Sequence, residues 1–330
     1  MSLNLEQLFS SFSNIKVAVI GDVMLDTYMW GSVERISPEA PVPIVSLQKK
    51  EYRIGGAGNV ALNTIALNAN TTILSIIGDD EDGKQLKKLL VEKNINCNYL
   101  LESKKRITTN KMRIISRNQQ MMRLDAEQIN DIDTELENEL LDTVKEYFAE
   151  NKPDVLIFED YNKGLLTETL IANLIALCKQ NNVITTVDPK RKNFFTYRGV
   201  TIFKPNLKEV KEGLNLLLDD VSEHSLQFIH EQLHQILQHK ISLITLSEKG
   251  IFYKEDAQHK IIPTHIRSIA DVSGAGDTVI AVASLVYAAN KNINLAAEIA
   301  NIAGGIVCEE VGTVAIDKEK LLKECLLLLN

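Results

Sequence analysis

Short apolar runs rich in β-branched residues alternate with longer amphipathic stretches along most of this 330-residue chain. The runs predict strands at 16–20, 72–77, 155–158, 183–187, 201–203 and 241–246. The longer stretches predict helices at 57–67, 82–93, 133–150, 167–180, 207–214, 222–239, 275–290, 294–305 and 317–329. Because strands separated by helices usually pair in parallel, the pattern predicts an α/β fold with a mostly parallel central sheet and helices on both faces.

Two regions interrupt this alternation. Residues 27–53 contain three prolines and short strand-like runs, and residues 99–125 include a period-2 pattern of apolar and polar residues. No helix separates these strands from their neighbours. We therefore expect one domain over 1–330, with a small antiparallel β lid formed by about 27–53 and 99–125.

Composition excludes several classes of protein. The net charge is −8, and the basic residues are scattered, which argues against a nucleic-acid partner. No apolar run reaches 18 residues, so no membrane span is expected. The four cysteines lie far apart without a Cys-x-x-Cys pair, which argues against a zinc site or a disulfide framework. The first residues lack the pattern of a signal peptide, and we expect a cytoplasmic protein.

The stretch 271–278 carries the most chemistry. It reads Asp-Val-Ser-Gly-Ala-Gly-Asp-Thr and precedes an apolar helix. Glycines at a helix start leave backbone N–H groups free to hold an anion, and the helix dipole favours a phosphoryl group there. A carboxylate in the same turn suits a general base for an attacking hydroxyl. The residues expected to carry this chemistry are Gly274, Ala275, Gly276 and Asp277.

This stretch resembles the C-terminal signature of the ribokinase-like (PfkB) carbohydrate kinases. A second signature of that family, Gly-Gly-Ala-Gly-Asn-Val-Ala, stands upstream at 55–61. Three further stretches, at 21–26, 35–43 and 116–125, are similar to the kinase domain of the bacterial heptose-phosphate kinases of lipopolysaccharide precursor synthesis. The resemblance runs from about residue 12 to the end of the sequence.

The resemblance implies a ribokinase-like fold and an ATP-dependent sugar kinase that needs Mg²⁺, with K⁺ bound in some relatives. It implies phosphorylation of D-glycero-D-manno-heptose 7-phosphate at O1 to the 1,7-bisphosphate. It also implies a homodimer, because the lid often forms the dimer contact in related kinases. In many relatives a nucleotidyltransferase domain follows on the same chain. Since this sequence ends at Asn330, we expect a separate nucleotidyltransferase to perform the next step.

The sugar is expected to contact residues near the first strand and the second signature. Two carboxylates four positions apart at the end of a strand can accept hydrogen bonds from vicinal hydroxyls. Paired glycines let the backbone approach a ligand, and an asparagine offers both a donor and an acceptor. Helix or turn capping is the alternative role for the carboxylates and the asparagine. The candidates are Asp22, Asp26, Gly55, Gly56 and Asn59.

Basic residues of the lid are candidates for a second phosphate on the sugar. Lys111 and Arg113 are two positions apart and share a face of a strand, and Arg117 and Arg123 share one if no bulge intervenes. Guanidinium groups suit a phosphate, and a sugar without phosphate needs none. Lys163, which follows a strand, is a further candidate. The alternative is ordinary solvent-exposed charge on a β ribbon.

The resemblance also assigns residues to the nucleotide and to metal ions. Glu209 belongs to an Asn-x-x-Glu element that helps to organise Mg²⁺ indirectly, and its asparagine alternatively serves as a simple helix N-cap. The nucleotide candidates are Lys190, Asn206, Glu209, Ser247, Lys249, Gly250 and Asn301. Three positions match a monovalent-cation site of some relatives, namely Asp271, Ser273 and Gly312.

Two other functions remain open from the sequence. One is a ribokinase-like kinase for another sugar, sugar phosphate or nucleoside, and the arginine-rich segment 113–123 favours a phosphorylated acceptor over a free one. The other is a regulator that binds sugar or nucleotide without turnover, against which the intact Asp277 and its glycine turn argue.

Overall fold

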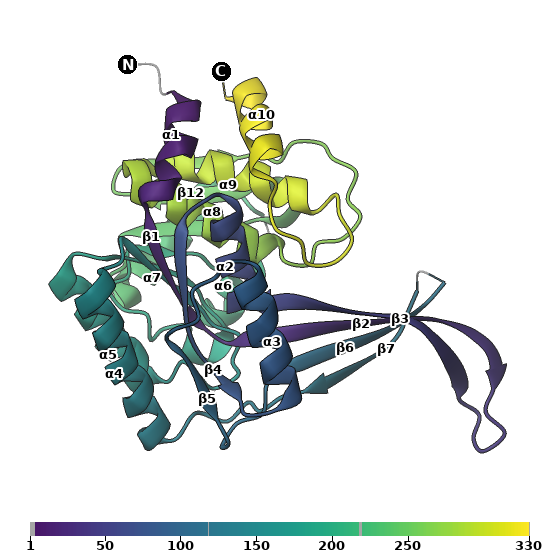
Figure 1. Cartoon of the computed structure of the whole chain (residues 1–330). Helices are drawn as coiled ribbons and strands as arrows, with labels where there is room; N and C mark the ends of the chain where they lie inside the picture. The colour runs from purple at the N-terminus through teal and green to yellow at the C-terminus, as the bar shows by residue number, and fades with distance from the viewer. Residues whose placement is uncertain (1–3, 118, 218–219, 330) are drawn as a thin grey trace.

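The computed structural model describes residues 4–117, 119–217 and 220–329. At its centre lies a nine-stranded sheet in the order β13-β12-β11-β10-β9-β8-β1-β4-β5 (Figure 1). Its strands are β1 (Lys16–Gly21), β4 (Asn70–Gly78), β5 (Leu100–Ser103), β8 (Val155–Glu159), β9 (Ile184–Asp188), β10 (Ile202–Phe203), β11 (Ile241–Thr245), β12 (Ile251–Glu255) and β13 (Gln258–Ile262). The strands from β11 to β5 pair in parallel, as predicted, and the unpredicted β12 and β13 continue the sheet as an antiparallel hairpin.

Helices cover both faces of this sheet, which confirms the predicted α/β class. One face carries α1 (Leu5–Ser11), α2 (Ala57–Ala66), α3 (Glu81–Glu92), α8 (Ala275–Asn290), α9 (Ile293–Val307) and α10 (Lys318–Leu328). The other face carries α4 (Thr134–Asn151), α5 (Glu168–Asn181), α6 (Leu207–Leu214) and α7 (Glu223–Leu237). In the described part of the chain, no helix combines the length and the apolar character that crossing a membrane requires.

The central strand β1 shows why the sequence builds two cores. Val17 and Val19 pack into the core under α2 and α8, whereas Ala18 and Ile20 pack into the core under α4 and α5. Successive side chains of a strand point to opposite faces, so a strand buried on both sides must be apolar throughout. This continuous apolar run is the pattern from which the parallel sheet was predicted.

A second sheet of four strands projects from the body in the order β3-β2-β6-β7 (Figure 1). Its strands are β2 (Val23–Ile36), β3 (Pro43–Gly56), β6 (Asn110–Ser116) and β7 (Gln119–Ala126). The β2–β3 and β6–β7 pairs are antiparallel, as the period-2 pattern indicated, and the central β2–β6 pair is parallel. The parallel pair arises because both central strands leave the body in the same direction. We call this sheet the lid.

The bounds of the lid differ from the prediction. Residues 100–103 were expected in the lid, but they form β5, which pairs with β4 at the edge of the central sheet. Burial of Leu100 in the main core accounts for this difference. In the other direction, β2 and β3 extend beyond 27–53 to Val23 and Gly56, so both strands run from the body to the lid without a break.

Candidate active site

The helix α8 begins directly after the glycine turn that the sequence singled out. Gly274 is its N-cap, with φ +79°, and a Cβ there would lie 2.9 Å from Asn59 Nδ2. Only glycine adopts this conformation without strain, and no side chain fits the space. The N–H of Ala275 donates to the carbonyl of Val272 at 3.3 Å. The N–H groups of the next two residues, 276 and 277, have no acceptor within the described residues and remain available to an anion.

Asp277 lies in the first turn of α8 with 5% of its surface exposed. Its carboxylate accepts hydrogen bonds from Asn59 Nδ2 at 2.7 Å and from the Tyr161 hydroxyl at 2.8 Å. Burial raises the pKa of Asp277 to about 6, and the two hydrogen bonds limit this rise. The group is therefore ionised at neutral pH, but basic enough to accept a proton, as a general base requires.

A cavity of about 180 Å³ lies in front of Asp277. It brings together residues from the first strand of the lid, from the second glycine signature and from the start of α8, which are far apart in the sequence. The predicted site residues that line it are Asp26, Gly55, Gly56, Lys111, Arg113, Ser273, Gly274 and Asp277. The sequence did not indicate the other three lining residues, which are Met24, Tyr161 and Thr313.

Two lid cations line this cavity. Arg113 forms an ion pair with Asp26 on the neighbouring strand. The ammonium group of Lys111 lies over the ring of Tyr161, 5.4 Å from its centroid, and forms no ion pair with a carboxylate among the described residues. Burial lowers the pKa of Lys111, and the nearby charge of Lys163 lowers it further. A half-buried cation without a carboxylate partner is suited to bind an anionic ligand.

The other predicted lid cations do not line the cavity. Arg117 is exposed at the turn between β6 and β7, and Arg123 pairs with Asp125 with half of its side chain exposed. A β-bulge between Ile114 and Ile115 shifts the register of this hairpin. Arg117 and Arg123 were expected to share a face only if no bulge intervened, so this condition is not met. Lys163 lies in the loop between β8 and α5, outside the lid, and forms a 2.7 Å ion pair with Glu127.

Asp22 has a different environment from the one expected for a sugar ligand. Its carboxylate accepts backbone hydrogen bonds from Tyr161, Lys163 and Leu165 at 3.0–3.2 Å. Burial raises its pKa to about 6, and the charge of Asp160 adds to this. Asp22 thus holds the 161–165 loop beside the cavity that Asp277 faces, without lining that cavity itself.

The predicted nucleotide residues follow the carboxyl ends of neighbouring strands. Asn206 and Glu209 form a capping box at the start of α6, in which each side chain accepts the other's backbone N–H at 2.8 Å. The second carboxylate oxygen of Glu209 accepts a hydrogen bond from Lys190 at 3.0 Å. Asn206 therefore serves as the N-cap of α6, which was its alternative role. The hydrogen bond from Lys190 to Glu209 joins this cap to the residues that follow β9.

The remaining nucleotide candidates flank the segment that follows β13. Ser247 to Lys249 form a 3₁₀ turn after β11, closed by Gly250. The backbone carbonyl of Glu248 in this turn accepts a hydrogen bond from the Thr264 hydroxyl, and Asn301 on α9 donates to the carbonyl of Pro263. The two groups of residues therefore contact consecutive positions of one segment, although they are some fifty positions apart in the sequence.

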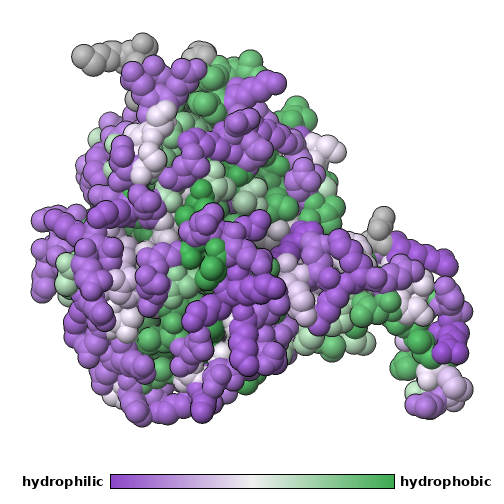
Figure 2. Space-filling view, viewed as in Figure 1, coloured by the Kyte–Doolittle hydropathy of each residue, from purple (hydrophilic) through white to green (hydrophobic). Residues whose placement is uncertain are grey.

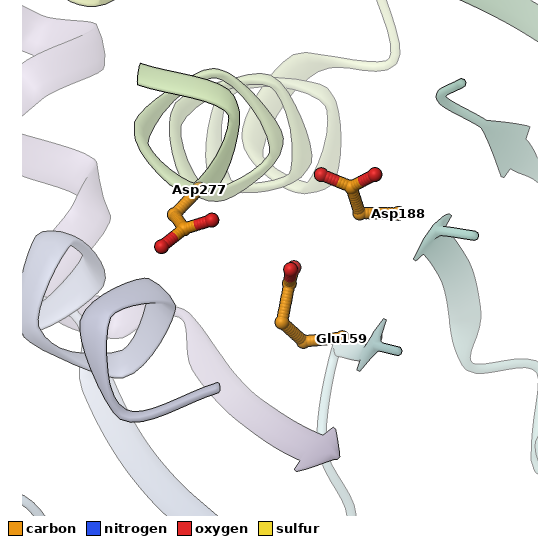
Figure 3. A group of neighbouring side chains, drawn as sticks. All are labelled: Glu159, Asp188 and Asp277. Atoms are coloured by element: carbon orange, nitrogen blue, oxygen red, sulfur yellow. The ribbon is translucent and has the colours of Figure 1, made fainter. Parts of the chain in front are cut away.

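Three buried carboxylates meet where β8, β9 and the start of α8 converge (Figure 3). Oxygens of Glu159, Asp188 and Asp277 lie within 4.8 Å of one another. Both carboxylate oxygens of Glu159 are buried without a hydrogen-bond partner among the described residues, and burial together with the charge of Asp188 raises the pKa of Glu159 well above the ordinary value. Glu159 was not predicted as a site residue, although its place at the carboxyl end of a strand was a usable signal.

Two lysines balance these carboxylates. Lys204, only 2% exposed, forms a 2.7 Å ion pair with Asp188, and Lys190 approaches the same carboxylate at 3.5 Å. Burial alone would raise the pKa of Asp188, but the charges of Lys190 and Lys204 outweigh it and hold this pKa below its ordinary value. A Cβ on Gly276 would lie 3.6 Å from Asp188 and 3.8 Å from Lys204, so the glycine turn directly adjoins this cluster.

The carboxylate cluster fits a divalent cation. Mg²⁺ prefers carboxylate oxygens as ligands, and Glu159 offers two buried oxygens for which residues 4–117, 119–217 and 220–329 provide no hydrogen-bond partner. Glu209, the residue assigned to Mg²⁺ from the sequence, instead uses its two oxygens for the backbone N–H of Asn206 and for Lys190.

The residues assigned to a monovalent cation bind one another. Asp271 accepts hydrogen bonds from the backbone and hydroxyl of Ser273 at 3.0 and 2.9 Å, and from the N–H of Gly312 at 2.9 Å. The carbonyls of the flanking residues 311 and 313 accept hydrogen bonds from the guanidinium group of Arg53. The Asp271 carboxylate and the carbonyls of 311 and 313 thus already accept hydrogen bonds from the protein itself, and the Arg53 cation beside them opposes the binding of K⁺ there.

The chain matches a protein family and two known relatives over almost its whole length. The pfkB family carbohydrate kinase model matches residues 14–320. The chain is 38% identical over 319 residues to the bifunctional protein HldE of Syntrophotalea carbinolica, and 37% identical over 320 residues to that of Geobacter sulfurreducens. These alignments cover 96% and 97% of the chain but 64% of each relative. The chain therefore spans just under two thirds of the length of these relatives.

Solved structures share the fold at low sequence identity. Phosphofructokinase-2 from Escherichia coli in complex with potassium superposes with a TM-score of 0.80 at 17% identity, over 96% of this chain and 100% of that one. Ribokinase of Arabidopsis thaliana, complexed with ribose and ATP, superposes with a TM-score of 0.73 at 15% identity, over 94% and 99% of the two chains.

Proposed function

The chain belongs to the pfkB family of carbohydrate kinases, and we propose that it transfers the γ-phosphoryl group of ATP to O1 of D-glycero-D-manno-heptose 7-phosphate. The product is the 1,7-bisphosphate, a precursor for ADP-heptose and the lipopolysaccharide core. The family makes the chain a phosphotransferase with an alcohol as acceptor. The heptose assignment is supported by the resemblance of residues 21–26, 35–43 and 116–125 to the heptose-phosphate kinases.

One observation carries the reaction type: a buried carboxylate faces the cavity beside free N–H groups at the start of α8. In our proposal Asp277 accepts the proton of the O1 hydroxyl while the sugar oxygen O1 attacks the γ-phosphorus and ADP leaves. The N–H groups of Gly276 and Asp277 stabilise the charge on the transferring phosphoryl group. Asn59 and Tyr161 orient the carboxylate of Asp277 through their hydrogen bonds. Closure of the lid excludes water and so limits ATP hydrolysis.

The neighbouring residues fit the remaining parts of the two substrates. Lys111, which has no carboxylate partner in the described part of the chain, is the first candidate for the 7-phosphate. Asp26, which lines the cavity, is a candidate for the sugar hydroxyls, whereas Asn59 is fully buried and donates to Asp277 instead. When bound, Mg²⁺ neutralises the β- and γ-phosphates, and Glu159 and Asp188 would hold it. The cytoplasm, where thiols stay reduced, is the proposed location, and all four cysteines are free.

The projecting lid supports the proposal of a homodimer. The lid exposes large apolar side chains, and Figure 2 shows apolar residues gathered on this arm. More than two fifths of the surface of each of these side chains is exposed: Ile36, Val42, Leu47, Met121, Met122 and Leu124. Apolar area of this kind marks a surface that a second protein covers. Sedimentation equilibrium measures the stoichiometry directly, and a monomer at all concentrations would contradict the proposal.

The acceptor is tested with a panel of substrates. The purified protein is incubated with Mg-ATP and heptose 7-phosphate, fructose 6-phosphate, fructose 1-phosphate, ribose or adenosine, and ADP release is followed. We expect the highest kcat/KM with the heptose phosphate. Turnover that favours ribose or adenosine would contradict the proposed acceptor while leaving the kinase reaction intact.

The same panel tests the lid cation. Replacing Lys111 by Met removes the cation from the cavity, and a charge-assisted hydrogen bond of about 1.5–3 kcal/mol corresponds to a roughly 10- to 150-fold rise in KM for the sugar phosphate. The KM for ATP should stay unchanged. Lys50→Met is the matched control, because Lys50 is an exposed lid lysine away from the cavity. Equal effects of the two substitutions would contradict a phosphate contact at Lys111.

Tyr161→Phe is expected to shift the pH profile of turnover. The base works only when ionised, so kcat of the wild type should fall about tenfold per pH unit below the pKa of Asp277, which is about 6. The Tyr161 hydroxyl donates to the carboxylate and favours its ionised form. Removing this hydroxyl should raise the apparent pKa by roughly 0.5–1 unit, for a hydrogen bond of about 1 kcal/mol. An unchanged or lowered apparent pKa would argue against this contact.

A further inference from the structure

Arg53 connects the lid to the body at a point close to the site. It lies on β3, three positions before the end of that strand, and its guanidinium group reaches the turn at 311–313. There it donates to the carbonyl of Val311 at 2.9 Å and to that of Thr313 at 3.4 Å. Glu51 accepts a 2.7 Å hydrogen bond from Arg53 Nε, and the guanidinium carbon lies 4.8 Å from the centroid of the Tyr28 ring. Arg53 is thus held in place from the lid side.

The turn that Arg53 contacts is joined to the anion-binding segment. Gly312, between the two carbonyls, donates its N–H to Asp271, and Asp271 also holds the backbone N–H of Ser273. Ser273 directly precedes Gly274, the N-cap of α8. A continuous series of contacts therefore runs from the lid, through the 311–313 turn and Asp271, to the residues that start the helix.

The packing at this turn leaves little freedom. Gly312 has φ +75°, and a Cβ there would lie 2.5 Å from the guanidinium group of Arg53 and 3.0 Å from the hydroxyl of Tyr28. A side chain at position 312 would displace the guanidinium group from the carbonyls. The glycine both adopts the left-handed conformation and permits the close approach of a cation to the backbone.

We propose that Arg53 is a positioning residue and the built-in cation of this segment: it holds the 311–313 turn and the 271–274 segment in place when the lid lies against the body. Its fixed positive charge on the two carbonyls takes the place of a bound monovalent cation. Turnover by this protein therefore does not depend on K⁺. The inference rests on the kinase reaction of the proposed function, but on no particular acceptor.

The test combines kinetics with hydrogen exchange. The acceptor is the fastest member of the panel, so an incorrect heptose assignment leaves the test intact. For the wild type, kcat in potassium, sodium and tetramethylammonium chloride at equal ionic strength should agree within about twofold. Arg53→Met removes two hydrogen bonds from a charged donor, and we expect kcat to fall by about 10- to 100-fold with little change in KM for the acceptor. Arg53→Lys keeps the charge and should retain most of the turnover.

Hydrogen exchange supplies a readout without substrate. The amides of residues 271–278 should exchange faster in Arg53→Met than in the wild type, equally with and without K⁺, while those of the central strand β1 stay unchanged. Lys50→Met, on the same strand, is the control and should behave as the wild type in both assays. A severalfold activation of the wild type by K⁺, or wild-type turnover and exchange in Arg53→Met, would overturn the proposal.

Discussion

Asp277→Asn is expected to lower kcat by about 10²–10⁴-fold, the usual contribution of a general base. The amide has the same shape as the carboxylate but cannot accept the proton of the attacking hydroxyl. Its oxygen can still accept from Asn59, and its NH₂ group can donate to the Tyr161 hydroxyl, so the side chain should keep its place. The KM values for both substrates should therefore change little. Initial rates at saturating ATP and acceptor measure the effect.

A second aspartate at a helix start serves as the control. Asp317 is the N-cap of α10, where asparagine caps equally well, and it lies outside the cavity that Asp277 lines. Asp317→Asn should therefore leave kcat unchanged. If Asp277→Asn keeps turnover within a few-fold of the wild type, another group must accept the proton and Asp277 loses its assigned role.

Lys204→Met is expected to lower the free energy of unfolding by about 3–5 kcal/mol, the usual cost of removing one partner of a buried ion pair. Lys204 and its partner Asp188 are almost fully buried, 2.7 Å apart. The substitution leaves Asp188, Glu159 and Asp277 close together, with the partly exposed Lys190 as the remaining ion-pair partner of Asp188 among the described residues. Urea denaturation in metal-free buffer measures the loss.

The pH dependence of this loss has a definite sign. Without Lys204 the pKa values of the clustered carboxyl groups rise in the folded state above their values in the unfolded chain. A raised pKa means that the folded state binds more protons, so the variant gains stability as the pH falls through the raised pKa values. The difference from the wild type should therefore be larger at pH 8 than at pH 6.

Two further variants keep this prediction testable. Lys208→Met, on the exposed side of α6, should cost less than about 0.5 kcal/mol, because its ion pair with Glu212 is on the surface. The double variant Lys204→Met/Asp188→Asn lacks the unpaired charge and should recover part of the lost free energy of unfolding. This recovery is expected even if the Lys204→Met single variant does not fold. A loss below about 1 kcal/mol for Lys204→Met would show that the cluster is balanced in another way.

The sequence was sufficient for features that depend on local periodicity. Apolar runs such as 17–20 predicted the buried parallel strands, and the glycine turn before Asp277 predicted the start of a helix. Both succeed because the geometry of a strand or a turn is set by residues adjacent in the chain. The antiparallel hairpin of β12 and β13 was missed, as was β5, because their pairing depends on which strand edge is free.

The candidate site was only partly predictable for a related reason. The sequence placed Asp26, Lys111 and Arg113 near a sugar, and all three line the cavity. It did not reveal that Asp22 binds the backbone of the 161–165 loop. A carboxylate at the end of a strand can face a ligand or its own backbone, and the choice depends on the path of a loop more than a hundred positions away.

By itself, the sequence therefore determined the α/β class, the family and the identity of the candidate base, since each is written in a contiguous pattern of residues. Only the tertiary structure decided what surrounds that base. Asn59 and Tyr161 reach Asp277 across 218 and 116 positions, and Arg53 reaches the 311–313 turn across some 260. Such contacts arise when the lid and the helices pack against the sheet, and packing joins residues whose spacing in the chain carries no signal.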